Sequence, residues 1–145
     1  MKKLLLAFCS LSIVVSAHAQ VMTPQPSTSS KLEQTIGMTD VSVTYSRPRV
    51  KGRKIFGDLV PFGKMWRTGA NKNTVFNFQH DVRIDGKPLK AGSYALYTVP
   101  SDGNWEFIFY SDSENWGLPK NWDDSKVALR FLYLLNNKVR NSVDG

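Results

Sequence analysis

The chain has 145 residues, with 19 Lys and Arg, 12 Asp and Glu, two His and one Cys, and its formal net charge is +7. This length is sufficient for one domain with a hydrophobic core that does not depend on disulfide bonds. A single cysteine and two histidines exclude Cys-ligated zinc or iron–sulfur sites and His-rich metal sites, so we expect no metal and no cofactor.

Residues 1–19 are typical of a secretory signal peptide. Lys2 and Lys3 precede an apolar run of about a dozen residues, and Ala17-His18-Ala19 follows. The run is too short to span a bilayer, which takes about 20 residues. Cleavage before Gln20 would remove the single cysteine and leave one imidazole. We therefore expect an exported protein, periplasmic or extracellular, with no transmembrane segment after cleavage.

The N-terminal part of the expected mature chain changes character near residue 35. Residues 20–34 are rich in Pro, Ser and Thr and lack apolar periodicity, so we expect a flexible leader there. The first predicted strand covers residues 41–46, where apolar and polar side chains alternate. Pro48 ends that strand.

Three further apolar stretches predict strands at residues 74–84, 93–99 and 105–110. The first has room for a bulge or bend at His80-Asp81, and Asp85-Gly86 follows it as a tight-turn signal. The third is apolar at nearly every position, which predicts burial on both faces. Residues 124–136 fit both a helix and a strand, and their length slightly favours a helix. The pattern indicates a single all-β domain, either an antiparallel β-sandwich or a partly closed barrel.

Two long stretches carry a resemblance to a known family: "GRKIFGDLVPFGKMWRTGAN" at 52–71 and "AGSYALYTVPSDGNWEFIFYSDSENWG" at 91–117. In them the chain resembles the DUF2911 family, a family of unknown function found in exported proteins of Bacteroidetes-type bacteria. The resemblance covers residues 35–130 and implies an exported, β-rich, sandwich-like domain, without implying a reaction or a ligand. Lys72 stands where similar proteins often carry an acid. Residues 131–145 look atypical, and our hypothesis is that the chain is truncated or frame-shifted near residue 130.

The positive charge is concentrated in residues 47–72, which hold eight Lys and Arg against the single acid Asp58. Arginine pairs bidentately with carboxylate or phosphate, and tryptophan stacks on sugar rings or cations. A turn that contains glycine also lets the backbone approach a ligand closely. We therefore expect a binding loop, whose candidate residues are Arg47, Arg49, Arg53, Lys54, Trp66, Arg67 and Asn71.

The expected partner of this loop is an anionic small molecule, a glycan or another envelope component, and not nucleic acid, because the protein is expected outside the cytoplasm. A structural role is also open, with Trp66 as a core anchor and Arg67 as a clamp on loop carbonyls. The odd-numbered cations from Arg47 to Arg53 would share one side of an extended segment. There they would face an anionic surface or protect an exposed edge.

No catalytic motif accompanies this basic segment. His80 is next to Asp81, but neighbours on a strand point to opposite faces, and the chain has no Gly-x-Ser-x-Gly elbow. Glu106 is the one acid inside an apolar strand stretch. We expect a non-catalytic binding or envelope-interaction module with no catalytic residue. The alternative is a hydrolase of envelope glycans or peptides that uses its acids and His80.

Overall fold

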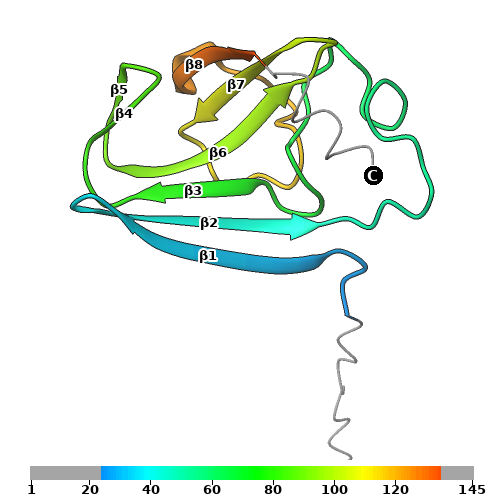
Figure 1. Ribbon diagram of the computed structural model, residues 1–145, viewed down its shortest axis with the longest axis horizontal. Helices are drawn as coiled ribbons and strands as arrows, with labels where there is room; N and C mark the ends of the chain where they lie inside the picture. Colours follow the sequence, from blue (N-terminus) through cyan, green and yellow to red (C-terminus); the bar gives the residue numbers. More distant parts are fainter. Residues whose placement is uncertain (1–23, 135–145) are drawn as a thin grey trace, which may run out of the picture.

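Regular structure in this protein is almost entirely β, as the alternating apolar segments predict (Figure 1). The computed structural model describes residues 24–134. In chain order its elements are β1 (Thr28–Ile36), β2 (Thr39–Arg47), β3 (Thr74–Phe78), β4 (Val82–Ile84), β5 (Lys87–Leu89), β6 (Gly92–Val99), β7 (Asn104–Tyr110), η1 (Asp124–Lys126) and β8 (Val127–Leu134). The expected signal peptide, residues 1–19, lies outside the described range. Within that range, no helix has the length and apolarity needed to cross a membrane.

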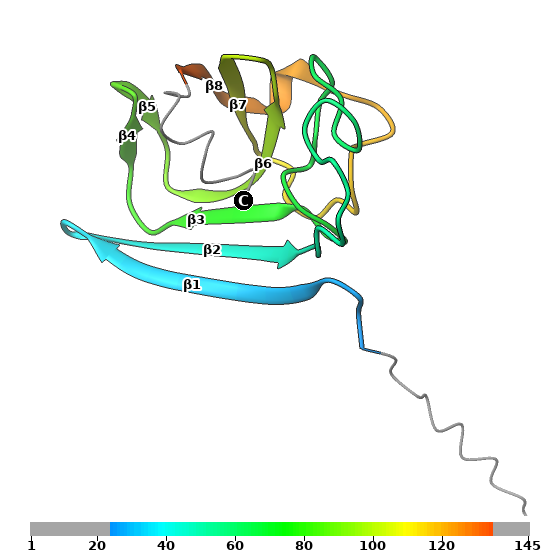
Figure 2. The same ribbon diagram turned by 45° about the vertical axis from the view of Figure 1, so that its right-hand side comes forward.

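Six strands form one antiparallel sheet in the order β1-β2-β3-β6-β7-β8. In the described part of the chain β1 and β8 are its two edges, so the sheet is not closed into a barrel. It bends strongly, and β7 and β8 stand above β1, β2 and β3 in both views (Figures 1 and 2). The prediction of an antiparallel all-β fold is confirmed.

A separate hairpin of β4 and β5 lies beside this sheet. Asp85 and Gly86 connect its strands with φ values of 51° and 72°, and a two-residue type I′ turn requires such positive values. The continuous run expected over residues 74–84 is therefore divided between two sheets. The division falls at the predicted bend, where the Asp81 carboxylate accepts hydrogen bonds from Lys90 Nζ at 2.8 Å and Ala91 N–H at 2.9 Å.

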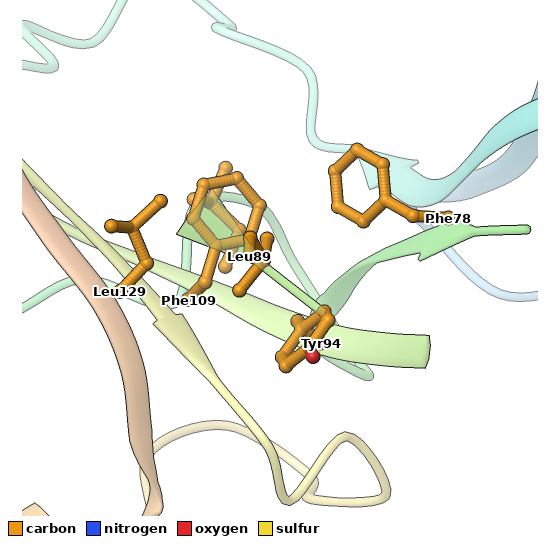
Figure 3. Packing of buried hydrophobic residues seen from close by; sticks show 6 residues of the cluster. Phe78, Leu89, Tyr94, Phe109 and Leu129 are labelled. Carbon is orange, nitrogen blue, oxygen red and sulfur yellow. The ribbon is translucent and has the colours of Figure 1, made fainter. Parts of the chain in front are cut away.

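The larger hydrophobic core lies on the sheet face that the hairpin covers. Its buried residues are Phe78, Leu89, Tyr94, Leu96, Phe109 and Leu129. Figure 3 shows five of these side chains coming together from β3, β5, β6, β7 and β8. The Phe109 ring is central, with centroids 6.0 Å from Phe78 and 6.4 Å from Tyr94. Each fully buried side chain of this size contributes about 1.5–3 kcal/mol to stability.

A second core occupies the opposite face, because alternate residues of a strand point to opposite sides. Ala95 and Tyr97 of β6 meet Ile108 and Tyr110 of β7 there, and all four are at most 1% exposed. The ring of Trp122, from the segment between β7 and β8, covers them and stacks on Tyr110 at 4.5 Å. The last residues of β7 are thus buried on both faces, as the apolar sequence predicts.

The leader expected at residues 20–34 is wrong from Thr28 onward, because β1 starts there. β1 pairs along its whole length with β2, from Thr28 opposite Arg47 to Ile36 opposite Thr39. Its side chains are nearly all exposed, so backbone hydrogen bonds rather than an apolar face define the strand. A polar strand of this kind has the composition of a loop.

The helix favoured for residues 124–136 is also wrong in the described part of that segment. A single 3₁₀ turn, η1, is capped by the Asp123 side chain, and β8 follows it up to Leu134. Leu129 and Phe131 pack on the larger core with the two-residue period of a strand. Tertiary pairing with β7 therefore decides between the two structures that the sequence allows. Residues 135–136 lie outside the described range.

Candidate ligand-binding groove

The connection from β2 to β3 begins with a tight basic turn. Lys51 and Gly52 have φ values of 52° and 68°, and Arg53 N–H donates to Val50 O at 3.1 Å. The Arg53 guanidinium donates to Val50 O at 2.9 Å and to Arg49 O at 2.6 Å, which holds the turn together. The one-sided stripe expected for the odd-numbered cations does not form, because the two left-handed residues reverse the chain.

The second half of this connection returns to the sheet and lies against β6. Trp66 exchanges two backbone hydrogen bonds with Thr98, at 2.7 and 2.9 Å, and Gly63 N–H donates to Pro100 O at 2.8 Å. Since the pairing of β3 with β6 extends only to Leu96, Trp66 continues the ladder of β6 beyond it. The basic segment is therefore anchored to the rigid part of the fold at its C-terminal half.

Three half-buried aromatic rings gather where the connection meets β7. The Phe56 centroid lies 6.0 Å from that of Trp66 and 4.8 Å from that of Trp105, and both pairs are edge to face. Such aromatic pairs contribute about 0.5–1.5 kcal/mol beyond the area they bury. They form an apolar floor beside the basic turn.

The turn after Trp66 is strained. Thr68 and Asn71 have φ values of 54° and 58°; asparagine tolerates this left-handed conformation, but a β-branched residue such as Thr68 rarely adopts it. Thr74 Oγ1 donates to Thr68 O at 2.5 Å, the Thr68 and Thr98 hydroxyls lie 3.1 Å apart, and Asn71 Nδ2 donates to Ser27 O at 3.2 Å. Strain of this kind persists only where the surroundings impose it, and it is concentrated at functional sites.

A broad, open groove of about 1830 Å³ lies between this connection and the turn that joins β6 to β7. The cations that line it are Arg49, Lys51, Arg53, Lys54, Lys64 and Arg67. Asp102 is the only acid among the described residues of the lining. The aromatic and large aliphatic side chains of the lining include Phe56, Leu59, Phe62, Trp66, Trp105 and Leu118.

The groove cations are not ion-paired within residues 24–134. Every ion pair in that range engages Lys31, Lys90, Lys126 or Arg130 instead. All the groove cations except Arg67 are exposed. A concave surface with an excess of positive charge raises the local concentration of anions, and salt screens this attraction over about 8 Å at physiological ionic strength.

Arg67 differs from the other groove cations because its side chain is half-buried and joins two loops. Its Nε donates to Gly69 O at 3.4 Å. Its Nη1 lies only 3.1 Å from the point that a β-carbon on Gly117 would occupy. The guanidinium therefore fills the space that glycine leaves in the segment between β7 and β8. These contacts suit a residue that positions the loops around a groove.

The structure brings together five of the seven predicted binding residues in the groove lining: Arg49, Arg53, Lys54, Trp66 and Arg67. Arg47 ends β2 and is not part of the lining, and Asn71 lines a separate, smaller cavity. The binding residues predicted from the sequence did not include Lys64, although it is one of the eight Lys and Arg in residues 47–72. They also did not include Phe56 and Trp105, whose contact exists only once the connection has folded back onto the sheet.

The acids considered for catalysis are engaged in other contacts. A hydrogen bond from Lys90 holds the pKa of Asp81 below its ordinary value, and Asp81 makes no hydrogen bond with His80, which is exposed. Glu106 lies 3.4 Å from Arg130 Nε in an ion pair. Residues 24–134 contain no group of three His, Cys, Asp or Glu side chains placed to hold a metal ion.

Fold and site together define an antiparallel all-β domain that carries a basic, aromatic-lined groove. The chain belongs to the DUF2911 family, described as a protein of unknown function, and the match covers residues 27–143. This confirms the resemblance seen in the sequence. The match extends beyond the expected limits of 35 and 130, so it includes β1 and β8. No curated protein and no solved structure matches the chain.

Proposed function

We propose that this chain is an exported, non-catalytic binding module that holds an anionic ligand of the cell envelope in the basic groove. The observation that carries the proposal is the balance of charge in the groove, where six Lys and Arg face one acid. None of the six is ion-paired with another residue of the described range. A phosphate or carboxylate that enters the groove gains charge-assisted hydrogen bonds without breaking an ion pair between these cations and another residue of 24–134.

Exposed apolar side chains in the groove support a ligand that also has an apolar part. Val50, Leu59, Phe62 and Leu118 line it and are between 45% and 56% exposed. Clustered apolar surface with a polar rim commonly marks a binding site. An anionic amphiphile such as an alkyl phosphate would place its charge among the cations and its chain on the aromatic floor.

The cations have different roles in this proposal. Arg49, Lys54 and Lys64 are exposed and make no side-chain hydrogen bond to another described residue, so their charges are available to a ligand. Arg53 and Arg67 donate to backbone carbonyls of the loops, so they shape the groove. Hydrolysis has no comparable support, because Asp81 and Glu106 are already held by cations.

The proposal is tested by titrating the isotope-labelled protein with hexyl phosphate, inorganic phosphate and hexanol while recording amide chemical shifts. We expect hexyl phosphate to bind most tightly, with shifts concentrated in residues 49–67 and with weaker binding at higher salt. Binding of hexanol measures the contribution of the apolar chain alone, and binding of inorganic phosphate measures the contribution of the charged group alone. The proposal is wrong if none of the probes shifts the groove amides.

Two triple variants separate a local site from general attraction of anions. The test variant carries Arg49→Gln, Lys54→Gln and Lys64→Gln. The matched control carries Arg83→Gln, Lys87→Gln and Lys120→Gln, which remove the same charge outside the groove lining. The test variant should bind hexyl phosphate about tenfold more weakly or worse, because each charge-assisted hydrogen bond contributes about 1.5–3 kcal/mol. Equal weakening in both variants would contradict a groove site.

A further inference from the structure

Trp116, in the segment between β7 and β8, is exposed in a way that the other tryptophans are not. Its side chain is 63% exposed, and it makes neither a ring contact nor an indole hydrogen bond with any other described residue. Trp66, Trp105 and Trp122 are half-buried and each packs against another aromatic ring. An exposed side chain of this kind is common on protein surfaces, but an indole beside a cavity offers a flat apolar face and an N–H donor to a ligand.

The backbone on both sides of Trp116 is hydrogen-bonded to the buried part of the fold. Asn73 N–H donates to Asn115 O at 3.4 Å, and the Tyr97 hydroxyl donates to Gly117 O at 3.3 Å. Asn73 and Tyr97 are themselves buried and joined by a hydrogen bond of 2.6 Å from Asn73 Nδ2 to the Tyr97 hydroxyl. The exposed indole is thus presented from an ordered backbone, which reduces the conformational entropy that the protein would lose on binding a ligand there.

Trp116 borders an open cavity of about 440 Å³, and most of the residues that line it are Ser, Thr, Asn or Gln, although the surface they present is largely apolar. The exposed or half-buried hydroxyl and amide residues of this lining are Gln25, Ser27, Thr28, Ser29, Thr44 and Asn71. Tyr45 adds a second, half-buried aromatic ring. Among the described residues of the lining, Lys72 is the only charged one. The size falls within the range of about 300–1,000 Å³ typical of small-ligand sites.

This chemistry matches a neutral sugar better than the anion proposed for the groove. A pyranose ring has an apolar C–H face that stacks on an indole, and its edge carries hydroxyls that both donate and accept hydrogen bonds. Ser, Thr and Asn side chains also donate and accept, whereas an anion needs donors and cations. We propose that the cavity beside Trp116 is a second binding site, which takes a neutral sugar residue stacked on the Trp116 ring.

The test uses a panel of neutral hexasaccharides of glucose, mannose and N-acetylglucosamine, titrated into the folded protein while amide chemical shifts are recorded. At least one hexasaccharide should shift amides in residues 71–73 and 115–117. Trp116→Ala should weaken that binding about tenfold or more, whereas Trp116→Phe, which keeps an aromatic face, should retain part of it. Leu132→Ala, another large exposed side chain at 65% exposure, should change nothing.

These experiments can refute either of the two proposed sites without refuting the other. Binding of a neutral sugar at Trp116 should be insensitive to salt and to the triple Gln variant of the groove, whereas binding of hexyl phosphate should depend on both. If no hexasaccharide in the panel binds, the sugar site is wrong. It is equally wrong if Trp116→Ala leaves the affinity unchanged or if the groove variant abolishes sugar binding. The amide spectrum of each variant verifies that the fold is intact.

Discussion

Replacing Tyr97 by Phe removes one buried hydroxyl on which two loops depend. Tyr97 is 0% exposed, and its hydroxyl accepts a hydrogen bond from Asn73 Nδ2 at 2.6 Å and donates one to Gly117 O at 3.3 Å. Asn73 Oδ1 already lacks a partner among the described residues, so the substitution would leave the whole buried amide without one. A buried polar group without a partner costs about 1–3 kcal/mol, and the bond to Gly117 contributes about 1 kcal/mol more.

We therefore expect Tyr97→Phe to lower the free energy of unfolding by about 2–4 kcal/mol, measured by urea denaturation followed by circular dichroism. The ring contacts with Tyr110 and Trp122 should be retained, because Phe preserves the ring. Tyr133→Phe is the matched control, since Tyr133 is 56% exposed and its hydroxyl has no described partner. It should change stability by less than about 0.5 kcal/mol.

A double-mutant cycle with Asn73→Ala identifies the bond as the cause. Removing both partners should cost less than the sum of the single losses, with a coupling energy of about 1–2 kcal/mol. The Tyr97→Phe variant should also bind neutral hexasaccharides more weakly if its hydroxyl helps to place Trp116. The reasoning is refuted if Tyr97→Phe costs no more than the Tyr133→Phe control or if the cycle shows no coupling.

Two further outcomes follow from the same region. Gly69→Ala should destabilise the protein by about 3 kcal/mol in the same urea assay, because Gly69 has a φ of 152° and a β-carbon there would lie 3.1 Å from Thr74 Oγ1. Gly37→Ala is the control: Gly37 has a φ of 63° and open space around it, so the substitution should cost only about 1 kcal/mol. Burial raises the pKa of Tyr97 from 10.0 to about 12, so the unfolded chain releases this proton first. The wild type should therefore lose stability relative to Tyr97→Phe as pH rises from about 10 to about 12, because the variant has no hydroxyl to titrate at this position.

The sequence predicts those parts of the fold in which side-chain pattern and burial agree. β3, β6 and β7 alternate or are apolar throughout, and the buried core residues Phe78, Tyr94, Leu96 and Phe109 lie on them. Prediction from the side-chain pattern fails at β1, whose side chains are mostly polar and exposed. It also fails at β8, whose sequence fits a helix as well as a strand and whose strand conformation is decided by pairing with β7. In both cases the information lies in a partner strand rather than in the segment itself.

The cations of the candidate groove can be predicted from the sequence, because most of them lie close together in the chain. Arg49 and Lys54 can be identified from the charge count alone, without knowledge of the fold. The aromatic floor of the groove cannot be predicted from the sequence, because Phe56 and Trp105 are far apart in the chain. They are in contact only in the folded structure, in which Trp66 pairs with Thr98. Trp116 has a weak signal, a tryptophan within a turn-rich segment, but its exposure is a property of the folded molecule.

The polarity that conceals β1 from sequence analysis also protects the molecule from other chains. An edge strand presents unpaired backbone N–H and C=O groups, which can template the addition of a foreign strand and start aggregation. β1 is nine residues long and carries the Lys31–Glu33 ion pair near its middle. An incoming strand would have to accommodate both charges, which lie on either side of the exposed Leu32. The charged side chains of β1 thus oppose the addition of another strand at this edge of the sheet.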